Sequence, residues 1–137
     1  MKILTIILLL ILANNSYSEE SEYKFNIHLA SYHFNRDYDW NEKNYGFGVE
    51  KHTDSVYFGV GYFKNSYNED SFYLSIGVDT VMFNSVEIGL FSGIASGYSQ
   101  HNRGVGDFIL IGGISISKEG ISIELTPKFI SLSLSIN

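Results

Sequence analysis

Two stretches of the chain, residues 56–62 and 72–78, alternate strictly between large apolar residues and small or polar ones. A period of two is typical of a β-strand, because successive side chains point to opposite faces of the sheet. The short polar segment 64–70 between the two stretches predicts an antiparallel hairpin. The large apolar positions are Val56, Phe58, Val60, Tyr62, Phe72, Leu74, Ile76 and Val78. The opposite face carries Gly, Ser and Tyr, which suits a narrow lumen better than bulk water.

The rest of the chain repeats this pattern, with polar segments between the alternating runs. The pattern predicts strands over residues 23–34, 45–51, 56–62, 72–78, 86–94, 108–117, 121–126 and 129–136. Residues 35–44 and 97–107 are expected to form long polar loops, and residues 52–55, 79–85 and 118–120 to form turns. Long and short connections roughly alternate, as they do in outer-membrane barrels.

These features predict an all-β fold, an eight-stranded antiparallel transmembrane β-barrel. A soluble β-sandwich or a lipocalin-like barrel is the structural alternative. The sandwich is disfavoured by Glu87 and Glu124, which fall on the inward face and would be costly in a dry core. The chain also ends on a strand. The weakest element is 121–126, which is short for a spanning strand and is followed by a very short connection at Pro127-Lys128.

The first residues have the pattern of a secretory signal peptide. Lys2 precedes an apolar run over 3–13 in which Thr5 is the one polar residue, and the segment 14–18 that follows has small residues, Ser16 and Ser18, at the −3 and −1 positions of a cleavage site after Ser18. We therefore predict a signal peptide over residues 1–18 and a barrel domain over residues 19–137 that lies in the bacterial outer membrane. The apolar run is shorter than the roughly 20 residues of a spanning helix, although a retained membrane anchor is the alternative.

Composition narrows the possible functions. The chain has no cysteine, so disulfides do not stabilise it, and a closed barrel in a bilayer would replace them. The formal net charge of −6 argues against nucleic acid as a partner. The histidines His28, His33, His52 and His101 have no close metal-ligand spacing, so we expect no metal and no cofactor. We expect a monomer.

Two groups of residues are candidates for chemistry. His33 lies at the outer end of the first predicted strand, while Asn65 and Ser66 lie at the outer end of the third, so all three reach the same rim of the barrel. A histidine near a serine hydroxyl is the minimum for general-base activation and acyl transfer; the alternative is a polar rim residue beside an Asn-Ser turn. Inward residues that could line a pocket for a hydrocarbon chain are Tyr57, Gly61, Phe63, Phe91, Ile109 and Ile111. The alternative is that these side chains simply fill the lumen.

The order of several motifs resembles the lipid A palmitoyltransferase family of outer-membrane barrels. The motifs are His33, Trp40-Asn41-Glu42-Lys43, Tyr45-Gly46-Phe47-Gly48 and Phe63-Lys64-Asn65-Ser66-Tyr67. The resemblance implies a phospholipid donor, lipid A as acceptor, and a rim with a histidine, an aspartate and a serine. These fall on His33, Asn65 and Ser66, so an asparagine stands where the family has an aspartate. Asparagine cannot carry the negative charge, and a non-catalytic barrel that acts through its loops is the alternative.

Overall fold

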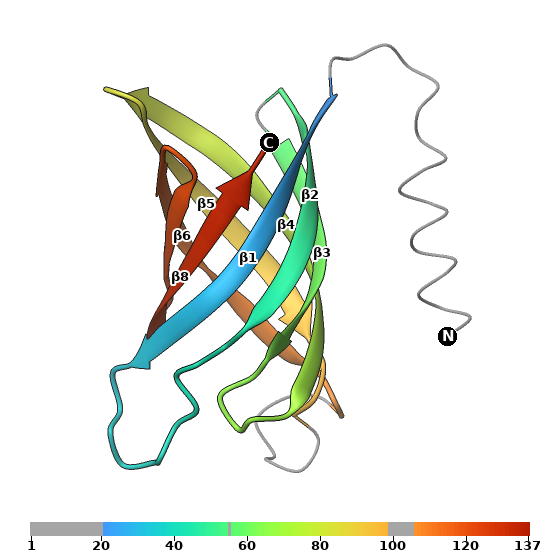
Figure 1. The fold of residues 1–137 in the computed structure, drawn as a ribbon, viewed down its shortest axis with the longest axis vertical. Helices are drawn as coiled ribbons and strands as arrows, with labels where there is room; N and C mark the ends of the chain where they lie inside the picture. The colour runs from blue at the N-terminus through green and yellow to red at the C-terminus, as the bar shows by residue number, and fades with distance from the viewer. Residues whose placement is uncertain (1–20, 55, 99–105) are drawn as a thin grey trace, which may run out of the picture.

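The computed structural model describes residues 21–54, 56–98 and 106–137, and this part of the chain forms a closed antiparallel barrel of eight strands (Figure 1). The strands are β1 (Ser21–His33), β2 (Gly46–Thr53), β3 (Val56–Lys64), β4 (Asp70–Phe83), β5 (Val86–Ala95), β6 (Ile109–Lys118), β7 (Ile121–Leu125) and β8 (Phe129–Ile136). Each strand pairs with its neighbours in sequence, and β8 closes the barrel on β1. Closure excludes the β-sandwich, as the sequence predicted.

The turns after β2, β4 and β6 lie at one end of the barrel, and the connections after β1, β3 and β7 lie at the other. The turns β2–β3, β4–β5 and β6–β7 share one end with the C-terminus, at the top of Figure 1. The connection over 34–45 and the one over 65–69 lie at the other end, which we call the loop end. Two of the tight turns have consecutive residues with positive φ, Asn84-Ser85 and Glu119-Gly120. Such pairs match the right-handed twist of a hairpin.

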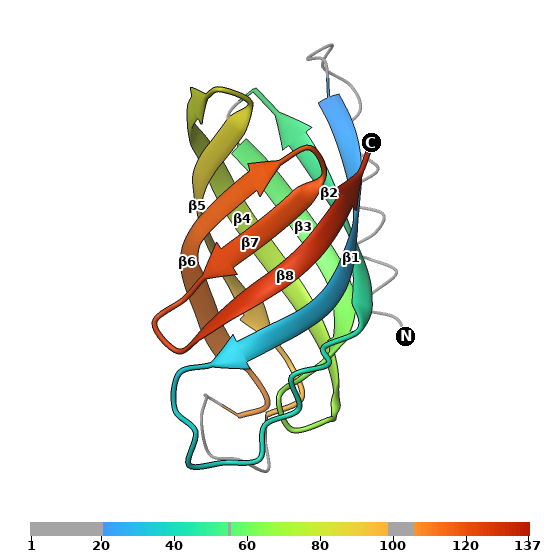
Figure 2. The same ribbon diagram turned by 60° about the vertical axis from the view of Figure 1, so that its left-hand side comes forward.

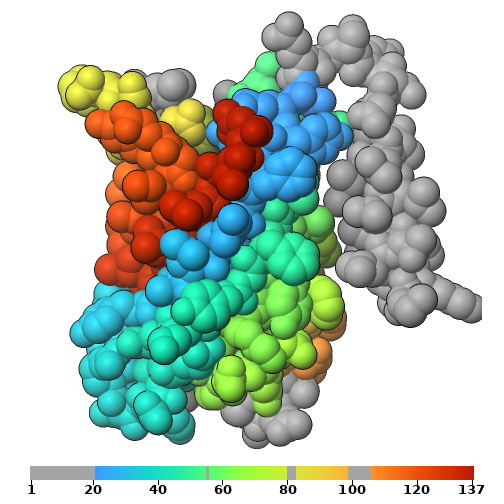
Figure 3. All heavy atoms as spheres, in the orientation of Figure 1, coloured from blue at the N-terminus to red at the C-terminus, as the bar shows by residue number. Residues whose placement is uncertain are grey.

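Side chains alternate between the lumen and the outer surface as the sequence pattern predicts. Large apolar residues from every strand point outward with much of their surface exposed, for example Phe47 at 66% and Leu90 at 54%. Figure 3 shows the side chains of β8, β1 and β2 next to one another over one face of the barrel. Tyr57 and Tyr73, on the opposite face of their strands, are buried. The outer surface is therefore apolar and the lumen is filled mainly by aromatic and polar groups.

The lumen is narrow because tyrosine rings lie across it. A Cβ on Gly61 would lie 2.5 Å from Cε1 of the Tyr73 ring, and a Cβ on Gly77 would collide with the ring of Tyr57. Glycine at these positions leaves room for a ring from a neighbouring strand. Tyr73 also forms a small apolar core with Ala95 and Tyr98 near the loop end.

Two predicted boundaries are wrong. The segment 79–85, predicted as a turn, continues β4 up to Phe83, and only Asn84-Ser85 turn the chain. The register of β4 on β5 shifts between Asp79 and Val81, so the regular alternation stops there although the strand does not. The predicted turn over 52–55 is also shorter, because β2 continues to Thr53.

The seventh strand is short, as predicted. It has five residues and is visible as the short arrow between β6 and β8 in Figure 2. The predicted signal peptide over 1–18 and most of the predicted loop over 97–107 lie outside the described residues. In the described part of the chain no helix is long and apolar enough to cross a membrane.

Candidate functional site

His33 and Ser66 meet at the loop end. His33 is the last residue of β1, and Ser66 lies in the connection that follows β3. The Oγ atom of Ser66 lies 2.8 Å from Nε2 of His33, within hydrogen-bond distance. When the serine donates this bond, the imidazole carries its proton on Nδ1. We call these two residues the His33–Ser66 pair. Its geometry is that of a hydroxyl beside its general base.

Two aromatic rings pack against the imidazole of His33. Trp40 stacks on it with ring centroids 4.7 Å apart and planes 15° apart, and the ring centroid of Phe129 lies 5.5 Å from it at a tilt of 39°. His33 is only 6% exposed. Its main-chain N–H donates to Oε1 of Glu42 at 3.2 Å. Nδ1 of His33 is buried and has no hydrogen-bond partner among the described residues.

Glu42 is the charged group nearest to His33. Its Oε1 accepts the His33 main-chain N–H and pairs with Nη1 of Arg36 at 2.5 Å. The bond from the His33 main chain and the Arg36 guanidinium together lower the pKa of the Glu42 carboxyl. Glu42 is therefore ionised at neutral pH and places a negative charge beside the pair.

Asn65 is fully buried and all its hydrogen-bonding groups are used. Nδ2 donates to Oγ of Ser71 at 3.1 Å and to the carbonyl oxygen of Gly97 at 2.9 Å. Oδ1 accepts the main-chain N–H groups of Tyr67 at 2.9 Å and Glu69 at 3.0 Å. These four bonds fill the capacity of an amide side chain. Asn65 thus fixes the turn that carries the serine of the pair, and any orienting effect on the pair is indirect.

A small apolar cavity opens beside the pair. Its volume is about 90 Å³, and Ser66 is among the residues that line it. Four of the six residues predicted to line an acyl pocket do line this cavity, namely Tyr57, Phe63, Phe91 and Ile111. Ile109 instead packs against the core of Tyr73, Ala95 and Tyr98, and Gly61 lies under the Tyr73 ring. Sites for small organic ligands are usually larger, roughly 300 Å³ or more, so this lumen is largely filled by its own side chains.

Tyr73 and His28 both line this cavity. The Tyr73 hydroxyl lies 3.0 Å from Nε2 of His28, and the two rings meet edge to face. Glu50, Tyr57 and Glu124 line both this cavity and a second one, whose lining is mostly polar and charged.

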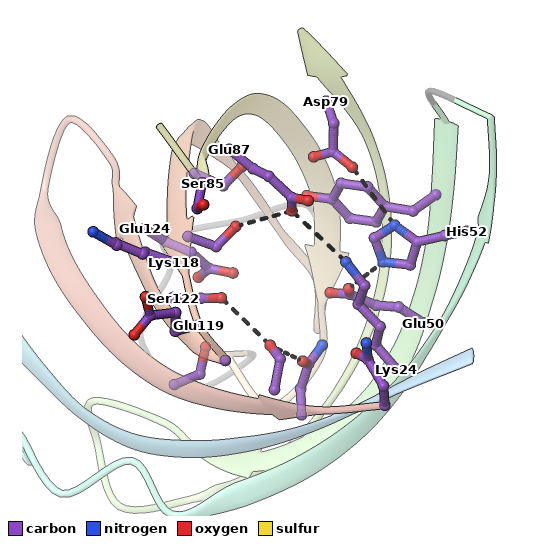
Figure 4. Close-up of a pocket in the computed structure, with 18 residues that line it drawn as sticks. Lys24, Glu50, His52, Asp79, Ser85, Glu87, Lys118, Glu119, Ser122 and Glu124 are labelled. Carbon is purple, nitrogen blue, oxygen red and sulfur yellow. Dashed lines mark hydrogen bonds and ion pairs between the residues drawn. The ribbon is translucent and has the colours of Figure 1, made fainter. Parts of the chain in front are cut away.

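The second cavity has a volume of about 250 Å³ (Figure 4). It opens toward the end of the barrel that carries the turns after β2, β4 and β6, which we call the turn end. Lys24 pairs with Glu87 at 3.7 Å, and His52 contacts Glu50 at 2.9 Å and Asp79 at 3.6 Å. Figure 4 shows these side chains pointing into one space from several strands. The inward orientation predicted for Glu87 and Glu124 is confirmed, since both line this cavity. Within the described ranges no group of three or more histidine or acidic side chains is arranged to hold a metal ion.

Trp40 and Phe129 are site residues that the sequence analysis did not assign. The stack on Trp40 depends on the path of the 34–45 loop, which has no periodic pattern. The contact of Phe129 with His33 could have been predicted from the strand order, because antiparallel pairing of β1 with β8 places Phe129 directly opposite His33. Residues paired in this way point to the same side of the sheet.

No known family model matches this chain, and no curated protein is similar to it at a significant level. The resemblance to the lipid A palmitoyltransferases therefore stays a prediction. The functional argument rests on the geometry of the His33–Ser66 pair and its surroundings.

Proposed function

We propose that the protein is an outer-membrane acyltransferase that moves a palmitoyl-type chain from a phospholipid onto lipid A. The observation that carries the proposal is the 2.8 Å contact between Ser66 Oγ and His33 Nε2, at a site where Ser66 also lines the apolar cavity. A nucleophile, its base and a hydrocarbon-lined space thus meet at one rim. The motifs that resemble the palmitoyltransferases run through this rim.

The pair provides the chemistry of acyl transfer. Nε2 of His33 takes the proton of Ser66 as Oγ attacks the ester carbonyl of the phospholipid. The lysophospholipid leaves with the proton from His33, and the acyl group stays on Ser66 as an ester. A lipid A hydroxyl then attacks this ester, loses its proton to His33, and Ser66 regains a proton as it leaves. In each half of the reaction the imidazole accepts a proton from the attacking hydroxyl and returns it to the leaving group.

The outer surface of the barrel supports the membrane placement. Phe25, Phe47, Phe58, Phe72 and Leu110 are each at least half exposed and lie on different strands or faces of the wall. Exposed apolar surface on this scale is rare in monomeric soluble proteins. A bilayer would cover it, and an apolar band is the outer surface of known membrane barrels. Aromatic side chains also lie near both ends, with Tyr45 at 60% exposed and Phe83 at 76%.

The wall between β6 and β7 offers a route for lipid. β6 pairs with β5 from Ile109, but its described pairing with β7 begins only at Ile114. In a bilayer, a backbone N–H or C=O group that faces lipid tails is costly unless another group forms a hydrogen bond with it. This part of the wall lies toward the loop end, which is the end that carries the pair. It supports sideways entry of a lipid into the rim.

The test is mass spectrometry of lipid A from Gram-negative cells that express the full chain. The intact protein is expected to add one acyl chain, and His33→Ala and Ser66→Ala are expected to add none. Ser92→Ala and His52→Ala are matched controls, because Ser92 is exposed on the outer face and His52 lies in the charged cavity. Unchanged acylation in both rim variants would refute the proposal.

The filled lumen favours a second candidate, a non-catalytic barrel that acts through its loops. Tyr57 and Tyr73 are buried in the lumen, and the apolar cavity of about 90 Å³ has little room for a long chain. This candidate predicts folded barrels in the outer membrane with unchanged lipid A. Deletions within the 34–45 loop would then alter binding of the protein to its partners.

A further inference from the structure

The ring of Trp40 lies nearly parallel to the imidazole of His33, 4.7 Å away and tilted by 15°. We propose that Trp40 is the positioning residue for His33 and does by stacking what a carboxylate does in a serine-histidine-aspartate triad. This inference rests on the proposed acyltransferase function. In such a triad the third residue holds the imidazole through its Nδ1–H. Here Nδ1 of His33 has no partner among the described residues, so the ring must be oriented in another way.

Ring contacts limit the freedom of the imidazole. Trp40 covers one face, and the ring of Phe129 lies 5.5 Å away at a tilt of 39°. Rotation about the Cβ–Cγ bond would break the parallel stack on Trp40. The stacked orientation is also the one in which Nε2 faces Ser66 Oγ at 2.8 Å. The stack on Trp40 therefore selects the orientation in which His33 is able to act as a base.

Trp40 is itself held in place. Its Nε1–H donates to the carbonyl oxygen of Asn35 at 2.7 Å. Tyr38 and Tyr67 lie against its ring at centroid distances of 5.1 and 5.4 Å. A fixed indole is required, because a mobile ring would transmit no orientation to the histidine.

The next residue, Asn41, ties the same loop to the serine. Its main-chain N–H donates to the carbonyl oxygen of Ser66 at 2.9 Å, and its Nδ2 donates to the carbonyl oxygen of Asn65 at 3.0 Å. Adjacent residues of the loop thus contact the two members of the pair, Trp40 on the base and Asn41 on the turn of the nucleophile. This connection sets the distance between Oγ and Nε2.

The stack also suits the charge that forms during the reaction. When His33 takes the proton from Ser66 it becomes an imidazolium, and the face of an indole attracts a cation. The charged groups near His33, Glu42 and Arg36, belong to the same loop and form an ion pair with each other. Glu42 contacts the main-chain N–H of His33. Orientation of the ring is therefore assigned to Trp40.

The test compares Trp40→Leu and Trp40→Met, which remove the π face, with Trp40→Phe, which keeps one. Phe34→Leu is the control, since Phe34 is an adjacent aromatic residue, half exposed. Transfer is measured in membranes with a radiolabelled phospholipid and added lipid A. Folding of each variant is checked by its mobility shift on boiling in detergent. If one of the two aliphatic variants does not fold, the other supplies the comparison.

We expect kcat to fall at least about tenfold in Trp40→Leu and Trp40→Met with little change in KM, since misplacing a catalytic group slows the chemical step. Trp40→Phe and Phe34→Leu should stay near the wild-type value. In histidine-labelled protein in micelles, the His33 ring protons should lose an upfield shift in the aliphatic variants only. Unchanged kcat in the folded aliphatic variants, or a loss confined to KM, would overturn the proposal.

The two failures are distinguishable. If His33→Ala and Ser66→Ala abolish transfer while the aliphatic Trp40 variants retain it, the positioning role is wrong and the acyltransferase stands. If the rim alanine variants transfer as well as the wild type, the proposed function is wrong. In that case Trp40 has no base to position, and the inference is overturned with it.

Discussion

The side chain of Asn65 donates a 2.9 Å hydrogen bond to the carbonyl oxygen of Gly97, which links the turn after β3 to the end of β5. Gly97 has a φ of +88°, and a Cβ there would lie 2.5 Å from the Asp70 carbonyl oxygen. Only glycine therefore fits this close approach. The contact gives a structural reason for an amide at position 65. An aspartate has no N–H to donate and would place its charge against the Gly97 carbonyl.

We therefore expect Asn65→Asp to destabilise the barrel and to lower transfer. The loss of a donor to a buried carbonyl costs about 1–3 kcal/mol. The free energy of unfolding in urea, measured on protein in lipid vesicles, tests this value. Asn68→Asp is the control, because Asn68 is exposed in the same turn. Increased transfer in Asn65→Asp would contradict this account and favour a damaged active site that the carboxylate repairs.

The contact between Gly61 and the Tyr73 ring gives a second prediction. A Cβ at position 61 would lie 2.5 Å from Cε1 and 2.7 Å from Cζ of that ring, which is too close. Because the ring is buried and bonded to His28, it has little room to move. Gly61→Ala should therefore destabilise the barrel by about 1–3 kcal/mol, the usual cost of overpacking.

Gly106→Ala is the comparison for this variant. A Cβ on Gly106 meets no atom within 4 Å, so its cost is limited to the strain of its φ of +67°. Both variants are measured by urea unfolding in vesicles. Equal stability of Gly61→Ala and wild type would show that Tyr73 does not cross the lumen as described.

Much of the barrel was predictable from the sequence because strand alternation is a local signal. The alternation fails around Asp79 and Val81, where the strand pairing shifts register and the sequence Val81-Met82-Phe83 is an uninterrupted apolar run. A run of this kind cannot be distinguished from a turn by period alone. The predicted length of β4 was therefore wrong, although the strand itself was predicted.

The site was predictable only as far as topology determines it. His33 ends β1 and Ser66 follows β3, and both strands reach the same rim, so the closeness of the two residues followed from the order of strands. The role of Asn65 depends on Gly97, 32 positions further along the chain, and no local pattern connects the two. The Trp40 stack depends on an irregular loop. Contacts of this kind require the folded geometry.

The ionised state of Glu42 gives a pH prediction. Its pKa is lowered from the ordinary value of 4.5 by the His33 main-chain N–H and by Arg36. Because the folded pKa lies below the unfolded one, the contribution of Glu42 to stability is complete above pH 4.5 and is lost as the pH falls through the folded value. Glu42→Gln should therefore be less stable than wild type at neutral pH.

The stability difference between wild type and Glu42→Gln should shrink as the pH falls below 4.5. Urea midpoints across the acid range measure it. Added salt should reduce the difference at neutral pH, since the ion pair with Arg36 is partly exposed. A difference that stays constant with pH would assign the effect to loop packing instead of charge.

The outward position of Leu90 tests the membrane placement. Leu90 lies at the middle of β5, is 54% exposed, and pairs with Val78 and Ile114 on the neighbouring strands. In a bilayer, arginine at such a position costs about 2–4 kcal/mol near the midplane and about 0–1 kcal/mol near the interfaces. Phe83, at the turn end and 76% exposed, is the interfacial comparison. Leu90→Arg should therefore reduce the free energy of unfolding in vesicles much more than Phe83→Arg. In water both side chains would be solvated, so two small and equal effects, together with recovery of the protein in the soluble fraction, would mean that this barrel does not lie in a membrane.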